Sequence, residues 1–137
     1  MNKKTIKNIQ RQKGKRKITC LTAYTASVAK IIDNYVDIIL IGDSLGSTIY
    51  GMKNTQKVTL DMMKVHGKAV SQFCKKSFTI VDMPFNTYGN NREALVNAKS
   101  QGRLGEFLVR AYYTSAKIKL KADDVQGPFV KVASGSS

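Results

Sequence analysis

Two short apolar runs without polar alternation dominate the hydrophobic pattern of this chain. They are Asp37–Ile41 and Ser77–Asp82. Such runs predict strands that are buried on both faces of a parallel sheet. Each run stops abruptly, the first at Gly42–Asp43–Ser44 and the second at Asp82, where Pro84 blocks further strand pairing. Each predicted strand therefore presents a carboxylate where it ends.

Helical patterns alternate with these strands. A first strand is expected over Lys17–Ala23, and helices are expected over Tyr24–Asn34, from Leu60 to about Cys74 and from Asn91 or Arg92 to about Ser100. The Tyr24–Asn34 helix has a predicted apolar face of Val28, Ile31, Ile32 and Tyr35. This alternation implies right-handed βαβ units, so the predicted fold class is α/β with a parallel sheet.

The remaining stretches are less regular. Residues 1–17 predict a basic arm or short helix, and residues 18–100 form the α/β unit. Within that unit, Gly42–Val58 is longer than a plain connection needs, and long loops in compact domains are usually functional. Residues 101–137 are expected to be an unmatched tail, in which Glu106–Tyr113 and Ala116–Lys121 are candidate strands.

Composition limits the possible classes of protein. The 137 residues suffice for one domain, whereas a complete (β/α)8 barrel needs about 250. No apolar run approaches the ~20 residues of a membrane span and no signal peptide is apparent, which favours a cytoplasmic protein; the acid-free leader leaves an organellar presequence as the alternative. Cys20 and Cys74 are predicted to be reduced core thiols. With one histidine besides, a structural zinc site is excluded.

The formal charge of +14 is concentrated at the start of the chain. Residues 1–17 hold eight basic side chains and no acidic one. A basic arm can hold phosphates non-specifically. No nucleic-acid recognition motif or interleaved aromatic patch accompanies it, so a solvated basic surface is favoured over a nucleic-acid-associating module.

The two strand-end aspartates are the candidate chemical groups. Because the carboxyl ends of parallel strands meet at one rim of an α/β sheet, Asp43 and Asp82 are expected to lie near each other. A hard divalent cation needs oxygen ligands, and one or two protein carboxylates suffice when substrate and water complete the shell. The competing interpretation is that each aspartate forms a turn or cap after its strand.

Four motifs carry a family resemblance. They are Ile18–Tyr24, Ile41–Gly46, Val58–Asp61 with His66 and Ala69–Val70, and Val81–Phe85. In this order and spacing, from about residue 4 to about residue 99, the chain resembles ketopantoate hydroxymethyltransferase. The resemblance implies the N-terminal β/α units of a (β/α)8 TIM-type barrel that has been truncated, with an unmatched C-terminal tail.

The resemblance also implies an activity in pantothenate biosynthesis. The family transfers a hydroxymethyl group from 5,10-methylenetetrahydrofolate to 3-methyl-2-oxobutanoate, giving 2-dehydropantoate, with Mg2+ as the metal. The implied partners are therefore a small 2-oxo acid, folate and further copies of the chain in a homo-oligomer. Neither a membrane nor nucleic acid is expected as a partner.

Residue by residue, the resemblance implies that Asp43 and Asp82 bind the metal and the substrate. It places Ser44 against the substrate carboxylate and Tyr24 beside the active site. His66 is expected to be a core histidine with hydrogen-bond partners rather than a ligand.

The sequence also departs from the family pattern. Thr25 replaces an aspartate, Lys119–Leu120–Lys121 is the nearest counterpart of a Lys-x-Glu pair, and neither Glu93 nor Glu106 lies in a matching motif. No counterpart of the general-base glutamate is found, so no catalytic residue is assigned and a poorly active chain is expected.

Three alternatives stay open. The first is an enzyme of the phosphoenolpyruvate mutase/isocitrate-lyase type, against which the Val81–Phe85 motif argues. The second is the nucleic-acid-associating module, and the third is an inactive gene remnant. An open three-stranded sheet would also leave an unpaired edge, which predicts marginal stability for the isolated chain.

Overall fold

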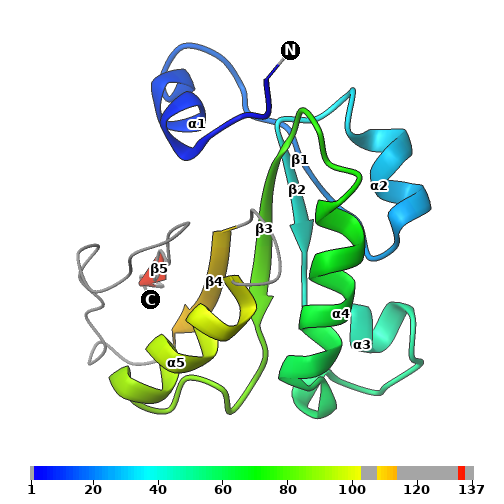
Figure 1. Ribbon diagram of the computed structural model, residues 1–137, viewed down its shortest axis with the longest axis vertical. Helices are drawn as coiled ribbons and strands as arrows, with labels where there is room; N and C mark the ends of the chain where they lie inside the picture. The colour runs from blue at the N-terminus through cyan, green and yellow to red at the C-terminus, as the bar shows by residue number, and fades with distance from the viewer. Residues whose placement is uncertain (1, 103–107, 114–132, 135–137) are drawn as a thin grey trace.

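The computed structural model describes residues 2–102, 108–113 and 133–134. The helices are α1 (Ile6–Gln12), α2 (Ala26–Ile32), α3 (Leu45–Thr48), the 3-10 helix η1 (Thr55–Lys57), α4 (Leu60–Ser71) and α5 (Asn91–Gly102). The strands are β1 (Cys20–Thr22), β2 (Ile38–Ile41), β3 (Phe78–Met83), β4 (Leu108–Tyr113) and β5 (Ala133–Ser134). The predicted α/β class is confirmed (Figure 1).

The strands form one sheet in the order β1-β2-β3-β4-β5, and every neighbouring pair is parallel. The register pairs Ile41 of β2 with Val81 of β3. Gly42–Asp43, which follow Ile41, therefore lie beside Asp82–Met83, the last two residues of β3. The strand predicted over Glu106–Tyr113 is present from Leu108 onward and pairs with β3, so the expectation of a three-stranded sheet is wrong. Residues 106, 107 and 116–121 lie outside the described residues.

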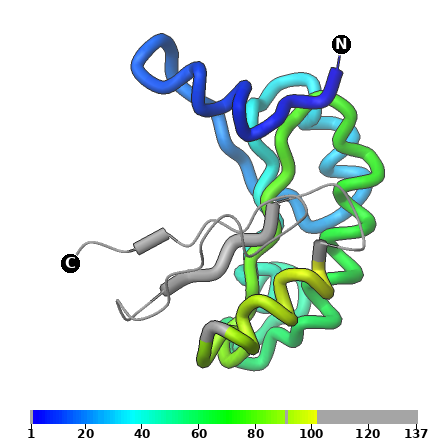
Figure 2. The backbone as a smooth tube through the Cα atoms, turned by 60° about the vertical axis from the view of Figure 1, so that its left-hand side comes forward, coloured from blue at the N-terminus to red at the C-terminus, as the bar shows by residue number. Residues whose placement is uncertain are grey.

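The core lies between the sheet and its helices. Figures 1 and 2 both show α2 and α4 on the same side of β2. Alternate strand residues face this layer and are buried, namely Ile39, Ile41, Val81 and Met83. Met63 and Val70 of α4 are buried in the same cluster. Thr59 caps α4, because its hydroxyl accepts the N–H of Met62 at 3.2 Å.

Three sequence-based expectations are wrong in detail. The stretch Gly42–Val58 is not a plain loop, because it contains α3 and η1. Cys20 is exposed, since β1 is the edge strand. In α2 the buried residue is Ala29, while Ile31 and Tyr35 of the predicted apolar face are exposed. Ile32 of that face packs against the core cluster together with Ala29, so the predicted face is buried only in part.

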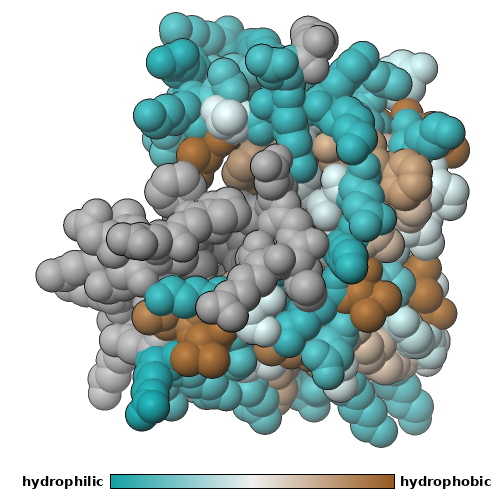
Figure 3. Space-filling model, in the orientation of Figure 1, coloured by the Kyte–Doolittle hydropathy of each residue, from teal (hydrophilic) through white to brown (hydrophobic). Residues whose placement is uncertain are grey.

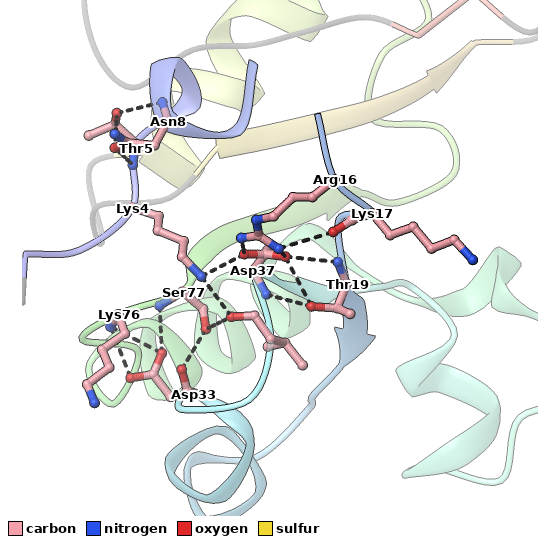
Figure 4. A network of polar contacts seen from close by, with 11 residues as sticks. Lys4, Thr5, Asn8, Arg16, Lys17, Thr19, Asp33, Asp37, Lys76 and Ser77 are labelled. Carbon is pink, nitrogen blue, oxygen red and sulfur yellow. Dashed lines mark hydrogen bonds and ion pairs between the residues drawn. The ribbon is translucent and has the colours of Figure 1, made fainter. Parts of the chain in front are cut away.

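The amino ends of β2 and β3 are held by two buried aspartates (Figure 4). Asp37 binds Lys4 at 2.7 Å and both guanidinium nitrogens of Arg16, and it accepts the N–H of Thr19 at 3.0 Å. These bonds, led by those from Arg16, outweigh burial and hold the pKa of Asp37 well below its usual range. The basic N-terminal segment is thereby attached to the sheet.

Asp33, at the end of α2, fixes the start of β3. Its carboxylate accepts the backbone N–H groups of Lys75, Lys76 and Ser77 at 2.8, 3.0 and 2.9 Å. Burial opposes ionisation, but these donors lower the pKa of Asp33. The buried aspartates Asp33 and Asp37 therefore stabilise the fold at this end of the molecule.

The surface over this end is largely hydrophilic (Figure 3). Lys7, Arg11 and Lys13 of the α1 region are exposed there. Within the described residues, no helix combines the length and the apolar character needed to cross a bilayer.

Candidate active site

The carboxyl end of β2 turns directly into a helix. The N–H of Leu45 donates to the carbonyl oxygen of Gly42 at 3.1 Å, and the N–H of Gly46 donates to that of Asp43 at 3.0 Å. Leu45 is fully buried and anchors the turn in the core. Asp43 is half-buried and Ser44 is exposed, so both side chains stand at the rim of the sheet.

The carboxylate of Asp82 lies against this turn. A Cβ added to Gly42 would lie 3.4 Å from Oδ2 of Asp82 and 3.0 Å from Oγ of Ser44. Asp82 itself is buried, and its carbonyl oxygen accepts the side-chain amide of Gln101 from α5 at 3.3 Å. A side chain at Gly42 would thus crowd the Ser44 hydroxyl and meet the Asp82 carboxylate at ordinary van der Waals distance.

Tyr24 completes the rim from the segment between β1 and α2. Its hydroxyl lies 2.7 Å from Oγ of Ser44. Burial raises the pKa of Tyr24, but hydrogen bonds led by the one with Ser44 outweigh it, so the pKa lies below its usual value. All four residues that the sequence singled out, Tyr24, Asp43, Ser44 and Asp82, are therefore at the carboxyl rim.

Tyr88 is a candidate site residue that the sequence analysis did not identify. Its half-buried side chain packs against the core cluster. Burial raises its pKa, and the negative charges of Asp43 and Asp82 raise it further, which places the phenol within electrostatic reach of both. It follows a loop in which Asn86 has a φ of 61° and Thr87 bonds the carbonyl of Pro84 at 2.6 Å. Because a loop residue follows no hydrophobic periodicity, the sequence pattern does not single out Tyr88.

His66 has the hydrogen-bond partners that the sequence predicts, but it is half-buried rather than in the core. Its Nδ1 lies 2.6 Å from the carbonyl oxygen of Tyr24, and its Nε2 lies 2.9 Å from the hydroxyl of Tyr50. The Tyr50 ring meets the imidazole edge-on, with centroids 5.8 Å apart. The sequence analysis did not identify Tyr50 as a partner of His66.

The donor set fits a hard divalent cation. Asp43 and Asp82 offer carboxylate oxygens, which Mg2+ prefers, and such an ion commonly takes its other ligands from substrate and water. Across the described residues, no three Cys, His, Asp or Glu side chains gather as a ready-made metal cage. Glu93 is turned elsewhere, because it accepts the N–H of Gly89 at 3.0 Å. Glu106 and Lys119–Leu120–Lys121 lie outside the described residues.

Comparison with known proteins decides the family. The family model described as ketopantoate hydroxymethyltransferase matches residues 3–108, ending at the first residue of β4. The chain belongs to the ketopantoate hydroxymethyltransferase family. That assignment confirms the resemblance found in the motifs.

Curated relatives of the family agree. The chain is 56% identical over 99 residues to the 3-methyl-2-oxobutanoate hydroxymethyltransferase of Pelagibacter ubique (strain HTCC1062). It is 53% identical over 93 residues to the enzyme of that name from Anaplasma marginale (strain St. Maries). These matches cover 72% and 68% of this chain but 38% and 34% of the relatives. The chain therefore spans little more than a third of their length.

Solved structures show the same fold at low sequence identity. A phosphonopyruvate hydrolase, solved with oxalate and Mg2+, matches with a TM-score of 0.63 at 12% identity, covering 88% of this chain and 44% of that one. A 2,3-dimethylmalate lyase of the PEP mutase/isocitrate lyase superfamily matches with a TM-score of 0.60 at 15% identity, covering 86% and 42%. These likenesses support a TIM-barrel-type fold, of which the chain covers a part.

Proposed function

We propose that this chain carries the metal-binding and 2-oxo-acid-binding part of a 3-methyl-2-oxobutanoate hydroxymethyltransferase. The observation that carries the proposal is the approach of Asp82 to the Gly42–Asp43–Ser44 turn, with Oδ2 3.4 Å from the position of a Cβ on Gly42. Two carboxylates and a hydroxyl at one rim match what the chemistry of a bound 2-oxo acid requires.

Each residue then has a distinct part. Asp43 and Asp82 would hold Mg2+, which as a Lewis acid polarises the keto group of the substrate and makes its C3 proton more acidic. Ser44 would receive the substrate carboxylate through its hydroxyl. Tyr24, 2.7 Å from Oγ of Ser44, would orient that hydroxyl.

Proton removal at C3 needs a further group. Among the described residues, the acidic side chains at the rim are Asp43 and Asp82, and Glu93 bonds the backbone of Gly89. A positioned base contributes roughly 10²–10⁴-fold to rate, so turnover by this chain with 5,10-methylenetetrahydrofolate is expected to be slow. Substrate binding and polarisation do not require that base.

Deuterium exchange at C3 of 3-methyl-2-oxobutanoate tests the proposal without folate. The exchange is followed by NMR in the presence of Mg2+, comparing the wild-type chain with Asp43→Ala and with Asp61→Ala. Asp61 is an exposed aspartate on α4 and serves as the matched control.

With buffer acting as the base, we expect slow exchange above the blank for the wild-type and Asp61→Ala chains, and none above it for Asp43→Ala. Equal exchange in all three chains contradicts the proposal, as does folded wild-type protein that shows neither exchange nor, by calorimetry, Mg2+-dependent substrate binding. Binding without exchange supports the binding part of the proposal and contradicts polarisation of the keto group.

A further inference from the structure

The imidazole of His66 connects two segments that border the candidate site. It projects from α4 and bonds the carbonyl oxygen of Tyr24 on one side and the hydroxyl of Tyr50 on the other. A carbonyl oxygen can only accept, so Nδ1 carries a proton; in the neutral ring, Nε2 then accepts the hydroxyl of Tyr50. His66 thus joins the segment after β1 to the segment after α3.

These bonds lead to Ser44. The backbone of Tyr24 is held by His66, and the phenol of the same residue lies 2.7 Å from Oγ of Ser44. Ser44 is exposed, so packing alone does not fix its rotamer. Its carbonyl oxygen is held separately by the hydroxyl of Thr48 at 2.6 Å. The direction of the Ser44 hydroxyl therefore depends on Tyr24.

We propose that His66 is a positioning residue of the site, which acts through Tyr24 to hold the Ser44 hydroxyl toward the substrate carboxylate. This inference rests on the proposed function. A planar ring with donor and acceptor nitrogens on different sides suits the task, since it reaches two partners without a flexible chain. His66 itself touches neither the substrate nor the metal in this scheme.

Two substitutions separate positioning from mere packing. His66→Asn keeps a donor near the position of Nδ1 and so retains the bond to Tyr24. In His66→Gln the longer side chain places its amide near the position of Nε2, so this variant favours the bond to Tyr50 and loses the bond to Tyr24. Val65→Thr, on the exposed neighbouring position of α4, is the control, and Tyr50→Phe is a milder change that leaves α4 intact.

The first readout is the backbone amide NMR spectrum of the ligand-free chain. We expect His66→Gln to shift the Tyr24 and Ser44 signals most, Tyr50→Phe and His66→Asn, which both lose the bond between Tyr50 and His66, to shift them less, and Val65→Thr to leave them near the wild-type positions. The second readout is calorimetric binding of 3-methyl-2-oxobutanoate with Mg2+. Loss of one hydrogen bond should raise the Kd about threefold to tenfold in His66→Gln, with His66→Asn close to wild type.

Unchanged Tyr24 and Ser44 signals in His66→Gln and Tyr50→Phe would overturn the inference. Equal effects of Asn and Gln would also overturn it, because they would indicate a structural role alone. If the wild-type chain binds no 2-oxo acid, the proposed function fails, while the ligand-free spectra still decide whether His66 fixes Tyr24 and Ser44.

Discussion

The carboxylate of Asp82 lies so near the backbone of Gly42 that a methyl group added to Gly42 would contact this carboxylate. The added Cβ would lie 3.4 Å from Oδ2 of Asp82 and 3.0 Å from Oγ of Ser44. Asp82 belongs to β3 and Ser44 to the turn after β2. Because a side chain at Gly42 would contact both, the arrangement of these two residues depends on the glycine between them.

Gly42→Ala should therefore impair the site more than the fold. The Ser44 side chain is exposed and can move away, but its hydroxyl then leaves its position beside Tyr24. We expect Mg2+-dependent binding of 3-methyl-2-oxobutanoate, measured by calorimetry, to weaken roughly tenfold, about the value of one hydrogen bond. Ser47→Ala, an exposed position on α3, is the control, and unchanged affinity in Gly42→Ala would contradict the expectation.

Gly46→Ala should instead destabilise the fold. Its Cβ would lie 2.5 Å from Cγ2 of Val58 and 3.2 Å from Sδ of Met52, and Val58 is buried. Overpacking of this kind costs about 1–3 kcal/mol of unfolding free energy, measurable by urea denaturation. Adding Val58→Ala removes the clashing atom, so the double variant should lose less than the sum of the single losses. Additive losses would argue against the clash.

Asp37→Asn should destabilise the chain in a pH-dependent way. The pKa of Asp37 is depressed in the folded state, so its ionised form stabilises the fold above the unfolded-state pKa of about 3.9, and this stabilisation is lost as pH falls toward the folded pKa. We expect a loss of about 2 kcal/mol at pH 7 for the charge-assisted bonds with Lys4 and Arg16. Urea denaturation between pH 7 and pH 3 should show the difference shrinking below about pH 4. A difference that is constant with pH would show that the carboxylate charge is not its origin.

Thr59→Ala should weaken the start of α4. The Thr59 hydroxyl accepts the N–H of Met62, and losing such a cap costs about 1 kcal/mol. Thr59→Ser keeps the hydroxyl and should remain near wild-type stability in thermal unfolding followed by circular dichroism. Equal losses in both variants would assign the effect to the lost methyl group.

The sequence was most informative for segments that are apolar on both faces, because these are buried whatever packs against them. The runs ending at Asp43 and Asp82 are apolar on both faces, so the strands and the rim they share follow from composition along a few residues. The caps at Thr25 and Thr59 depend on equally short stretches of sequence, because each hydroxyl accepts the N–H of the residue three positions later. Such features need no knowledge of what lies across the fold.

The errors arose where burial depends on distant parts of the chain. Cys20 is exposed because β1 has no neighbour on its outer side within the described sheet. Ile31 is exposed because α2 packs through Ala29. Tyr50, which bonds His66, and Tyr88 lie in loops, where neither period 2 nor period 3.6 applies. Their roles follow from three-dimensional placement that no single window of sequence contains.

The all-parallel sheet has a consequence for the order in which the molecule is made. From β1 to β4 no neighbouring pair is joined by a hairpin, so each of these pairings waits for the helical segment between its two strands. During synthesis, the turn after β2 emerges long before β3 does. The Asp43 carboxylate therefore has no Asp82 beside it until α4 has been made and β3 has added to β2, and a ribosome paused between them holds a chain with a strand end but no site.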